Sequence, residues 1–287
     1  MYSKSTYWAK THSILLVGLV LLIAGCGIIE KRILYSPKSS CQFWDSPIAC
    51  ETSGLEFQDV FFCSDDGIQL HGWFVAPAET TPRHCVLFSH GRTGNISSFK
   101  TQLLDFARTH QVAVFAYDYR GFGKSQGKPS EAGLYLDADA ASNWLCNHSN
   151  LKPTEIVVMG RSLGAAVAID LVNKDGAKAL IVESGFTSFA DIVQHHSRGL
   201  LSGKRCESKY DSESKIGSYQ GPILISHGVD DKLIPCYQGV KLAEAATSET
   251  TQFVKVAGGH KPQPNPKYQQ QLNDFFSYLS SRDCTTN

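Results

Sequence analysis

Apolar and polar positions follow two rhythms from residue 55 onward. Short apolar runs, rich in Val, Ile and Leu, have the length of buried strands and lie at residues 85–88, 112–117, 156–159, 179–182, 222–226 and 253–256. Between them, apolar residues recur every three or four positions, which is typical of helices that bury one face. These helical segments lie at residues 96–110, 131–146, from 164 onward, 239–246 and 268–280. Strands that alternate with helices form βα units, so the pattern predicts an α/β domain with a mostly parallel sheet.

Two further segments precede the first βα unit. Residues 58–63 and 68–76 flank a Ser-Asp-Asp-Gly sequence, and Asp-Gly is a preferred dipeptide in the tight turns of antiparallel hairpins. We therefore expect an antiparallel hairpin at the start of the sheet. No linker-like change of composition interrupts residues 55–282, which predicts one domain, whereas residues 26–54 lack periodicity and are predicted to be an anchor and linker.

Residues 186–220 form the least regular stretch and lie between two predicted strands. They include several polar and aromatic residues, namely His195, His196, Arg198, Lys204, Arg205 and Tyr210. The position of this stretch predicts a cap over a site. The adjacent histidines lack a suitably spaced third ligand, which disfavours a metal site, and Lys204 and Arg205 are expected on a solvated face.

The first 25 residues have the pattern of a secretory signal peptide. Two lysines precede an apolar run at residues 13–24 that ends in small residues. The sequence Ile-Ala-Gly-Cys-Gly at residues 23–27 resembles the lipobox of bacterial lipoproteins. This resemblance implies that Cys26 carries a diacylglyceryl group once residues 1–25 are removed. Two or three acyl chains would then hold the protein on a membrane.

Two observations bear on where the chain would reside. Gly27, rather than Asp, follows the cysteine, and resemblance to the sorting rule of diderm bacteria then implies the outer membrane of the bacterial envelope. An uncleaved signal anchor is the alternative, because no Asp, Glu, Lys or Arg lies between Thr11 and Ile29. That stretch is just long enough to span a bilayer if it is retained.

Composition narrows the functional classes. The 27 Lys and Arg residues balance the 27 Asp and Glu residues, so no global positive field favours binding to nucleic acid. The chain is 42% hydrophobic and 19% charged, which is ordinary for a globular protein. These values exclude collagen-like, wholly disordered and polytopic membrane proteins.

Nine cysteines in 287 residues suggest an oxidising compartment. Eight of them remain if Cys26 is acylated, and an even number permits disulfides, although the sequence leaves the pairing open. We favour a pair between Cys41 and Cys50, which bracket a short loop. No Cys-x-x-Cys occurs, so the spacing typical of zinc and thioredoxin-type sites is missing.

The sequence Gly-x-Ser-x-Gly, which can expose a serine on a sharp turn, occurs twice. Ser162 follows the apolar run at 156–159 and precedes a helix of small residues, which is the strand-turn-helix setting of a nucleophile. Ser125 is followed by Lys-Pro, and the proline prevents an immediate helix. We therefore predict that Ser162 is a nucleophile and that Ser125 lies in a glycine-rich loop.

A serine hydroxyl needs a base to accept its proton, and the base needs an acid to orient it. In strand-turn-helix hydrolases the chain order is Ser, acid, His. His260 follows the last predicted strand after a Gly-Gly pair, at the carboxyl end where open α/β sheets place their sites. Asp230 and Asp231 follow the run at 222–226, and either could be the acid. The nearby His227 is expected to be structural.

Five ordered motifs resemble those of the α/β-hydrolase superfamily. They are Ser-His-Gly-Arg-Thr-Gly-Asn at 89–95, Asp-Tyr-Arg-Gly-Phe-Gly-Lys-Ser at 118–125, Gly-Arg-Ser-Leu-Gly at 160–164, His-Gly-x-x-Asp-x-x-Ile-Pro at 227–235 and Gly-Gly-His at 258–260. The resemblance covers residues 55–282 and is nearest to the abhydrolase-domain serine hydrolases, a branch with esterases and protein depalmitoylases. It implies the α/β-hydrolase fold, with an N-terminal antiparallel hairpin, helices on both faces of a mostly parallel sheet, and a small or absent lid.

The same resemblance implies roles for individual residues. Ser162 is the nucleophile, Asp231 is the acid by its spacing from the His-Gly pair, and His260 is the base. The backbone amides of Arg92 and Leu163 form the oxyanion hole, and no metal or organic cofactor is required. Relatives often carry Asn-Ala-Gly-Asn where this chain has Arg-Thr-Gly-Asn, which keeps a backbone donor and adds a cation beside the substrate.

Together these observations predict a membrane-anchored serine hydrolase. It would cleave carboxylic ester or thioester bonds of small-molecule or lipid substrates through an acyl-enzyme on Ser162. A serine peptidase or amidase would use the same acyl-transfer groups and is one alternative. A non-catalytic envelope lipoprotein that uses the fold as a binding scaffold is another, because a fold does not dictate a function.

Overall fold

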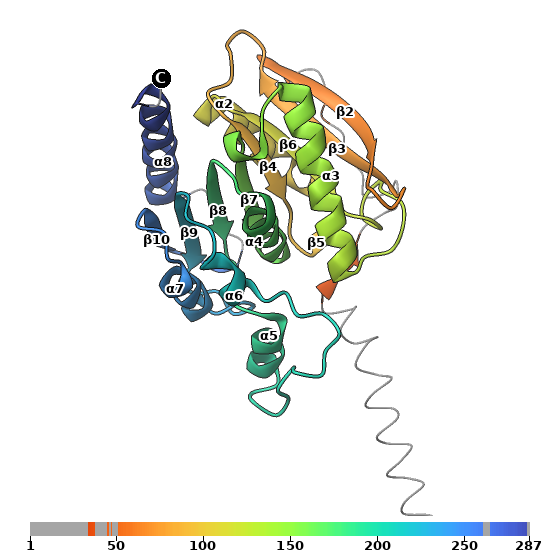
Figure 1. Cartoon of the computed structure of the whole chain (residues 1–287), viewed down its shortest axis with the longest axis vertical. Coiled ribbons are helices and arrows are strands. Elements are labelled where there is room, and N and C mark those ends of the chain that lie inside the picture. The colour runs from red at the N-terminus through yellow and green to blue at the C-terminus, as the bar shows by residue number, and fades with distance from the viewer. Residues whose placement is uncertain (1–33, 38–44, 46, 48–50, 261–264, 286–287) are drawn as a thin grey trace, which may run out of the picture.

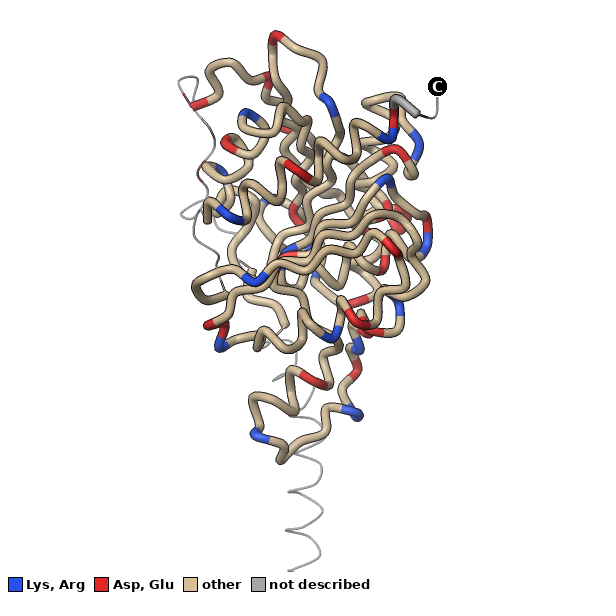
Figure 2. The backbone as a smooth tube through the Cα atoms, turned by 90° about the vertical axis from the view of Figure 1, so that its left-hand side faces the viewer, with Lys and Arg blue, Asp and Glu red and all other residues tan. Residues whose placement is uncertain are grey.

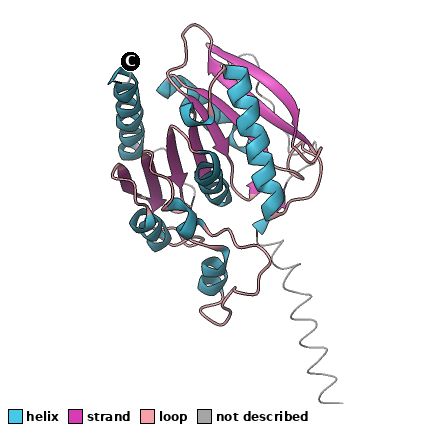
Figure 3. Cartoon of the chain, in the orientation of Figure 1, coloured by secondary structure: helices cyan, strands magenta, loops and turns pink. Residues whose placement is uncertain are grey.

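A computed structural model of the chain describes residues 34–37, 45, 47, 51–260 and 265–285. They form a sheet with helices on both of its faces (Figures 1 and 3). The predicted signal peptide with Cys26, and the favoured pair Cys41 and Cys50, lie outside the described residues.

The main sheet of the described chain has eight strands. In chain order they are β2 Leu55–Cys63, β3 Gln69–Pro77, β4 Cys85–Ser89, β6 Ala113–Asp118, β7 Val157–Arg161, β8 Ala179–Glu183, β9 Ile223–Gly228 and β10 Thr251–Val256. Their order in space is β10-β9-β8-β7-β4-β6-β3-β2. β3 is antiparallel to both β2 and β6, and the other neighbouring pairs are parallel. The predicted hairpin and the mostly parallel sheet are thereby confirmed.

Helices cover both faces of this sheet. They are α2 Lys100–His110, α3 Glu131–Ser149, α4 Leu163–Asp175, α5 Phe189–His196, α6 Ser212–Ile216, α7 Cys236–Ala245 and α8 Pro266–Thr285. One face is covered by α2 and α8, and the other by α3, α4, α6 and α7, while α5 lies beyond the carboxyl ends of the strands (Figure 1). Across the described residues, no helix combines the length and apolar content needed to cross a membrane.

The strands are apolar on both sides because both faces are covered. In β4, Val86 and Phe88 belong to the core beneath α2 and α8, whereas Leu87 belongs to the core beneath α3 and α4. Successive side chains of a strand point to opposite faces, so a continuous apolar run supplies both cores. Full burial of one such side chain stabilises the fold by about 1.5–3 kcal/mol relative to leaving it exposed.

One local difference from expectation lies at the helix predicted over 96–110. Its first turn is a separate 3-10 helix, Ile96–Phe99, and α2 begins only at Lys100. The side chain of Asn95 accepts a hydrogen bond from the amide of Ser97, which caps this short helix. Asparagine is a favoured N-cap because its side chain satisfies an otherwise unpaired amide.

Part of the predicted linker packs into the fold. β1, Ser36–Pro37, pairs in parallel with β5, Thr93–Gly94. Leu34 and Tyr35 are 4% and 7% exposed and contribute to the core. A strand of two residues is too short to show an alternation of apolar and polar positions, so no sequence pattern indicates the pairing of β1 with β5.

Candidate active site

Ser162 occupies a strained turn between β7 and α4. Its φ of 56° and ψ of −117° lie in a region that L-residues rarely adopt, at a cost of about 1–3 kcal/mol. The flanking glycines permit the turn. A Cβ at Gly160 would lie 2.1 Å from the carbonyl oxygen of Gly164, and a Cβ at Gly164 would lie 2.0 Å from that of Ser89. The turn presents the serine hydroxyl at the carboxyl end of the sheet.

The structure brings together the three side chains predicted to form a triad. His260 Nε2 lies 3.0 Å from Ser162 Oγ, and His260 Nδ1 lies 2.7 Å from Asp231 Oδ2. An ionised carboxylate can only accept, so Nδ1–H donates to Asp231 and Nε2 is left to accept the serine proton. The hydroxyl, the imidazole and the carboxylate therefore form a hydrogen-bonded series in which the imidazole can take up the serine proton and the carboxylate orients the imidazole.

Two loops that cross closely bring the acid to the base. Asp231 follows β9 and His260 follows the neighbouring strand β10. A Cβ at Gly228 would lie 2.3 Å from the carbonyl oxygen of Gly259, so the loops approach to a distance that only glycine allows. The amide of Asp230 donates to the carbonyl of Gly258 at 2.9 Å and joins the same loops. The side chain of Asp230 is exposed, and it is Asp231 that meets the imidazole.

The carboxylate of Asp231 is held as an anion. Burial alone would raise its pKa, but hydrogen bonds from His227, from His260 and from the amide of Ile234 outweigh burial and hold the pKa well below its usual range. The second oxygen, Oδ1, accepts from the amides of Leu233 and Ile234, both at 2.9 Å. Asp231 can therefore stabilise a positive charge that develops on the imidazole.

His227 has the structural position expected of it. It is 1% exposed, and its Nε2 lies 2.7 Å from the carbonyl oxygen of Ile234. This bond closes the loop that carries Asp231, so His227 positions the acid from beneath.

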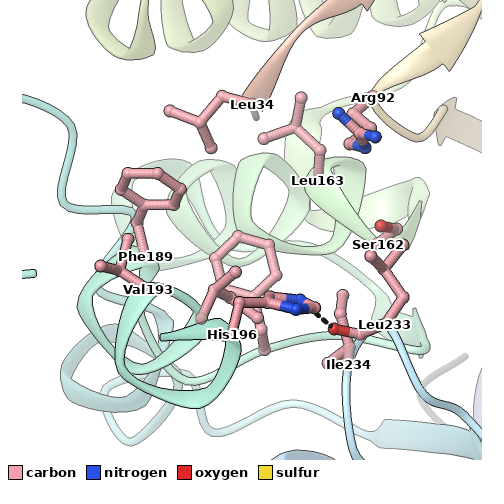
Figure 4. A pocket seen from close by; sticks show the side chains of 11 residues that line it. Leu34, Arg92, Ser162, Leu163, Phe189, Val193, His196, Leu233 and Ile234 are labelled. Atoms are coloured by element: carbon pink, nitrogen blue, oxygen red, sulfur yellow. Dashed lines mark hydrogen bonds between the residues drawn. The ribbon is translucent and has the colours of Figure 1, made fainter. Parts of the chain in front are cut away.

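The two residues predicted to supply the oxyanion hole follow the carboxyl ends of the neighbouring strands β4 and β7. Leu163 is the first residue of α4, where helix amides lack intrahelical partners and the helix dipole favours negative charge. Arg92 follows β4, and both residues line one cavity with Ser162 (Figure 4). The carbonyl of Arg92 accepts from the amide of Ser36 at 2.8 Å, so β1 holds this loop in place.

Buried polar groups support the same loop from below. Tyr119 Oη donates to the carbonyl of His90 at 2.8 Å, and Asp118 Oδ1 accepts from the amide of Ile96 at 2.8 Å. His90 Nδ1 donates to the carbonyl of Gly91 at 2.7 Å. His90 and Asp118 are 0% exposed, so fully buried side chains hold the loop that carries Arg92 in position.

Beside the triad lies a cavity of about 330 Å³. Its lining is mostly apolar and consists of Leu34, Leu163, Phe186, Phe189, Ile192, Val193, Leu233 and Ile234, with Arg92, Ser162 and His196 as the polar members. Several of these side chains come from α5, which confirms that the stretch 186–220 caps the site (Figure 4). His196 Nε2 bonds the carbonyl oxygen of Leu233 at 2.9 Å and joins the cap to the loop after β9.

Leu34 is a lining residue of the cavity that was not predicted from the sequence. It lies 128 positions before Ser162 in a segment without periodicity, so no sequence signal pointed to it. A buried hydrogen bond at 2.7 Å between Tyr35 Oη and Tyr210 Oη ties this N-terminal segment to the cap.

Neither Ser125 nor the paired histidines belong to the hydrogen-bonded series of Ser162, His260 and Asp231. Ser125 Oγ donates to the carbonyl of Asp118 at 2.6 Å and accepts from the amide of His71 at 2.9 Å, so it is a structural residue of the loop after β6. Where side chains are described, His195 and His196 belong to no group of three or more His, Cys, Asp or Glu able to hold a metal ion.

Cys63, Cys85, Cys146 and Cys236 carry free thiols.

Known proteins resemble this chain over most of its length. Residues 80–209 match the family described as serine aminopeptidase, S33. An uncharacterized protein of Mycobacterium tuberculosis is 32% identical over 259 residues, which are 88% of this chain and 89% of that protein. The alpha/beta hydrolase domain-containing protein WAV2 of Arabidopsis thaliana is 28% identical over 263 residues, which are 86% of this chain and 84% of that one. An esterase of Pyrococcus furiosus, 19% identical, has the same fold with a TM-score of 0.69 over 86% of this chain and 98% of its own.

Proposed function

This chain belongs to the α/β-hydrolase superfamily, and on that premise we propose that it is a serine esterase or thioesterase for acyl groups with an apolar chain. One observation carries the proposal. The hydrogen-bonded series from Ser162 through His260 to Asp231 opens into a cavity whose walls are mostly apolar.

The geometry supports an acyl-enzyme mechanism. His260 Nε2 accepts the proton of Ser162 Oγ while Oγ attacks the acyl carbonyl carbon, and the amides of Arg92 and Leu163 face the oxyanion that forms. The imidazolium then donates its proton to the departing alcohol or thiol. Water, activated by the same imidazole, releases the acid and regenerates the serine. One oxyanion donor is typically worth about 10²–10³ in kcat.

The cavity favours an ester over a peptide with a free amino terminus. An aminopeptidase must bind a positively charged α-amino group, and an acidic side chain is the natural partner for such a group. Among the described residues that line the cavity, Arg92 and His196 are the titratable side chains, and none is Asp or Glu. A cationic and apolar lining suits the carbonyl and hydrocarbon chain of an acyl group.

We further propose that the enzyme is anchored in the bacterial envelope, at the outer membrane, through an acylated Cys26. The lipobox-like sequence at residues 23–27 supports this proposal. Leu34, which lines the cavity, follows Cys26 by eight residues, and eight residues span at most about 28 Å. An anchor at Cys26 would therefore keep the cavity close to the membrane, where lipid acyl esters and acylated proteins are found. Cys26→Ser should abolish incorporation of radiolabelled fatty acid, and retained label would contradict the anchor.

A fluorophosphonate probe and a panel of p-nitrophenyl esters test the catalytic proposal. Wild-type protein should be labelled and should hydrolyse the esters, and Ser162→Ala should do neither. Ser125→Ala is the matched control and should retain both. Aminoacyl p-nitroanilides, turned over faster than esters, would favour a peptidase. Folded wild-type protein that takes no label would instead favour a binding scaffold.

A further inference from the structure

The cap ends in an exposed projection, which we call the cap finger and define as residues 197–205. It follows α5 and projects from the end of the molecule that lies beyond the carboxyl ends of the parallel strands (Figure 1). Two adjacent leucines lie on it, Leu200 at 88% and Leu201 at 53% exposure. Single exposed apolar residues are common on protein surfaces, but a projecting pair that leaves the core entirely indicates a surface that is covered by a partner.

The charged residues of the cap finger itself have one sign, while Asp191 and the exposed Glu207 flank it in the chain. Arg198, Lys204 and Arg205 are exposed, and no acidic residue lies between Gln194 and Cys206. Figure 2 shows Lys and Arg positions at the far end of the projection. Because the whole chain has zero net charge, this concentration of positive charge is a local feature. An apolar tip with flanking cations complements a surface of anionic headgroups over hydrocarbon.

The surface between the cap finger and the cavity is mixed in character. Tyr237, 48% exposed, lines a mostly polar depression together with Arg198, Gly199 and the polar side chains of Asp191, Gln194, His195 and Lys241. Leu233, 36% exposed, lies at the cavity itself. The cap finger follows α5, which also lines the cavity, so the cap finger and the cavity lie at the same end of the molecule.

We propose that the cap finger is a membrane-contact surface that docks on anionic lipid. Leu200 and Leu201 enter the interfacial layer, and Arg198, Lys204 and Arg205 contact headgroup phosphates. The proposal is independent of catalysis, but its purpose rests on the proposed function, since docking would present the cavity to acyl chains at the bilayer surface. The limited reach between Cys26 and Leu34 would bring an anchor and the cap finger to the same membrane.

Tryptophan quenching tests the contact without requiring turnover. Full-length Leu200→Trp is added to phosphatidylglycerol–phosphatidylcholine vesicles with brominated acyl chains, and the parent protein corrects for the native tryptophans. Phe61→Trp is the matched control, because Phe61 is 51% exposed on the edge strand β2, outside the cap. We expect strong quenching at position 200 and little at position 61. Equal quenching at the two positions would overturn the proposal, as would burial of the new tryptophan in protein without vesicles, which would indicate a second copy as the partner.

Charge reversal tests the lipid class. The double variant Lys204→Glu with Arg205→Glu should bind the vesicles more weakly, by about fivefold in affinity for each positive charge removed. Quenching of the tryptophan at position 200 should then require a higher lipid concentration. Lys128→Glu with Lys152→Glu makes the same charge change at exposed sites outside the cap and should have no such effect. Quenching that is equal in pure phosphatidylcholine and in phosphatidylglycerol vesicles would overturn the assignment to anionic lipid.

A kinetic comparison separates docking from chemistry. Leu200→Asp with Leu201→Asp should leave hydrolysis of dissolved p-nitrophenyl butyrate unchanged and reduce hydrolysis of p-nitrophenyl palmitate embedded in the anionic vesicles. Equal rates on the embedded ester would contradict a docking role. Fluorophosphonate labelling of the same samples reports the proposed chemistry separately, so failure of the chemistry and failure of docking give different results.

Discussion

The two Gly-x-Ser-x-Gly segments of this chain have identical spacing and different surroundings. Ser162 and Ser125 are both nearly buried, at 5% and 8% exposure, so accessibility does not distinguish them. Ser162 Oγ lies 3.0 Å from an imidazole nitrogen, whereas Ser125 Oγ bonds two backbone groups, the carbonyl of Asp118 and the amide of His71.

The difference shows that partners, rather than a motif, decide what a serine can do. A backbone carbonyl can accept a hydrogen bond from Ser125 but is too weak a base to take up its proton. This hydroxyl therefore only joins two segments of the backbone. Ser162 faces a base whose other nitrogen is oriented by a carboxylate, which is the arrangement that activates a hydroxyl.

The largest expected effect separates the two hydroxyls. Ser162→Ala should lower kcat for p-nitrophenyl esters by about 10⁴-fold or more, because the nucleophile itself is removed. Ser125→Ala should keep kcat within about twofold, since this serine contacts none of the reacting groups. Comparable losses in the two variants, measured at saturating ester, would place both serines in the mechanism.

Loss of the acid should have the next largest effect. Asp231→Asn should reduce kcat by about 10²–10⁴-fold, because an amide no longer stabilises the imidazolium or fixes its tautomer. Asp230→Asn, one residue away and exposed, is the matched control and should change kcat little. Ester hydrolysis by the two purified variants decides between the neighbouring aspartates, and the reverse ranking would move the role to Asp230.

The structural role of Ser125 should appear in stability instead. Ser125→Ala removes two buried hydrogen bonds and leaves the amide of His71 without this acceptor, which should lower the free energy of unfolding by about 1–3 kcal/mol. Urea denaturation followed by circular dichroism measures the change. An unchanged midpoint would show that the loop after β6 does not depend on this serine.

The two sites should also differ in pH dependence. The pKa of Asp231 is depressed in the folded protein, so its ionised form stabilises the fold above the ordinary Asp pKa of about 3.9, and this contribution is lost as the pH falls through the folded pKa. The difference in unfolding free energy between wild type and Asp231→Asn should therefore narrow on acidification. The deficit of Ser125→Ala involves backbone partners and should stay nearly constant, as denaturation at several pH values would test.

The smallest expected effect concerns the N-terminal segment. Tyr35→Phe removes the buried hydrogen bond to Tyr210 and should cost about 1 kcal/mol of stability. Because this bond joins the residue just before β1 to the cap, Tyr35→Phe should also raise KM for long-chain esters with little change in kcat. Denaturation and ester kinetics measure both quantities, and a variant with unaltered KM would show that the bond does not shape the cavity.

Local residue patterns were sufficient for much of the fold and for the choice of Ser162 and His260, whereas the choice of Asp231 over Asp230 depended on the resemblance to the α/β-hydrolase superfamily. The alternation of strands and helices, the Asp-Gly hairpin and the preference for Ser162 over Ser125 depend on neighbours in the chain, so the sequence expresses them directly. The carboxyl ends of parallel strands meet at one edge of a sheet, so residues that follow strands, namely Ser162, His260 and one of the two aspartates after β9, were expected to converge. Their hydrogen bonds agree with that expectation.

Tertiary structure alone decided the shape of the cavity and what closes it. Leu34 lines the wall and Tyr35 bonds a tyrosine 175 positions away, although their segment has no periodic pattern. The outward position of Leu200 and Leu201 is likewise invisible in a sequence where Leu-Leu is usually a core signal. Such features depend on which distant surfaces meet, and that is determined by packing of the whole chain rather than by the preference of any one segment.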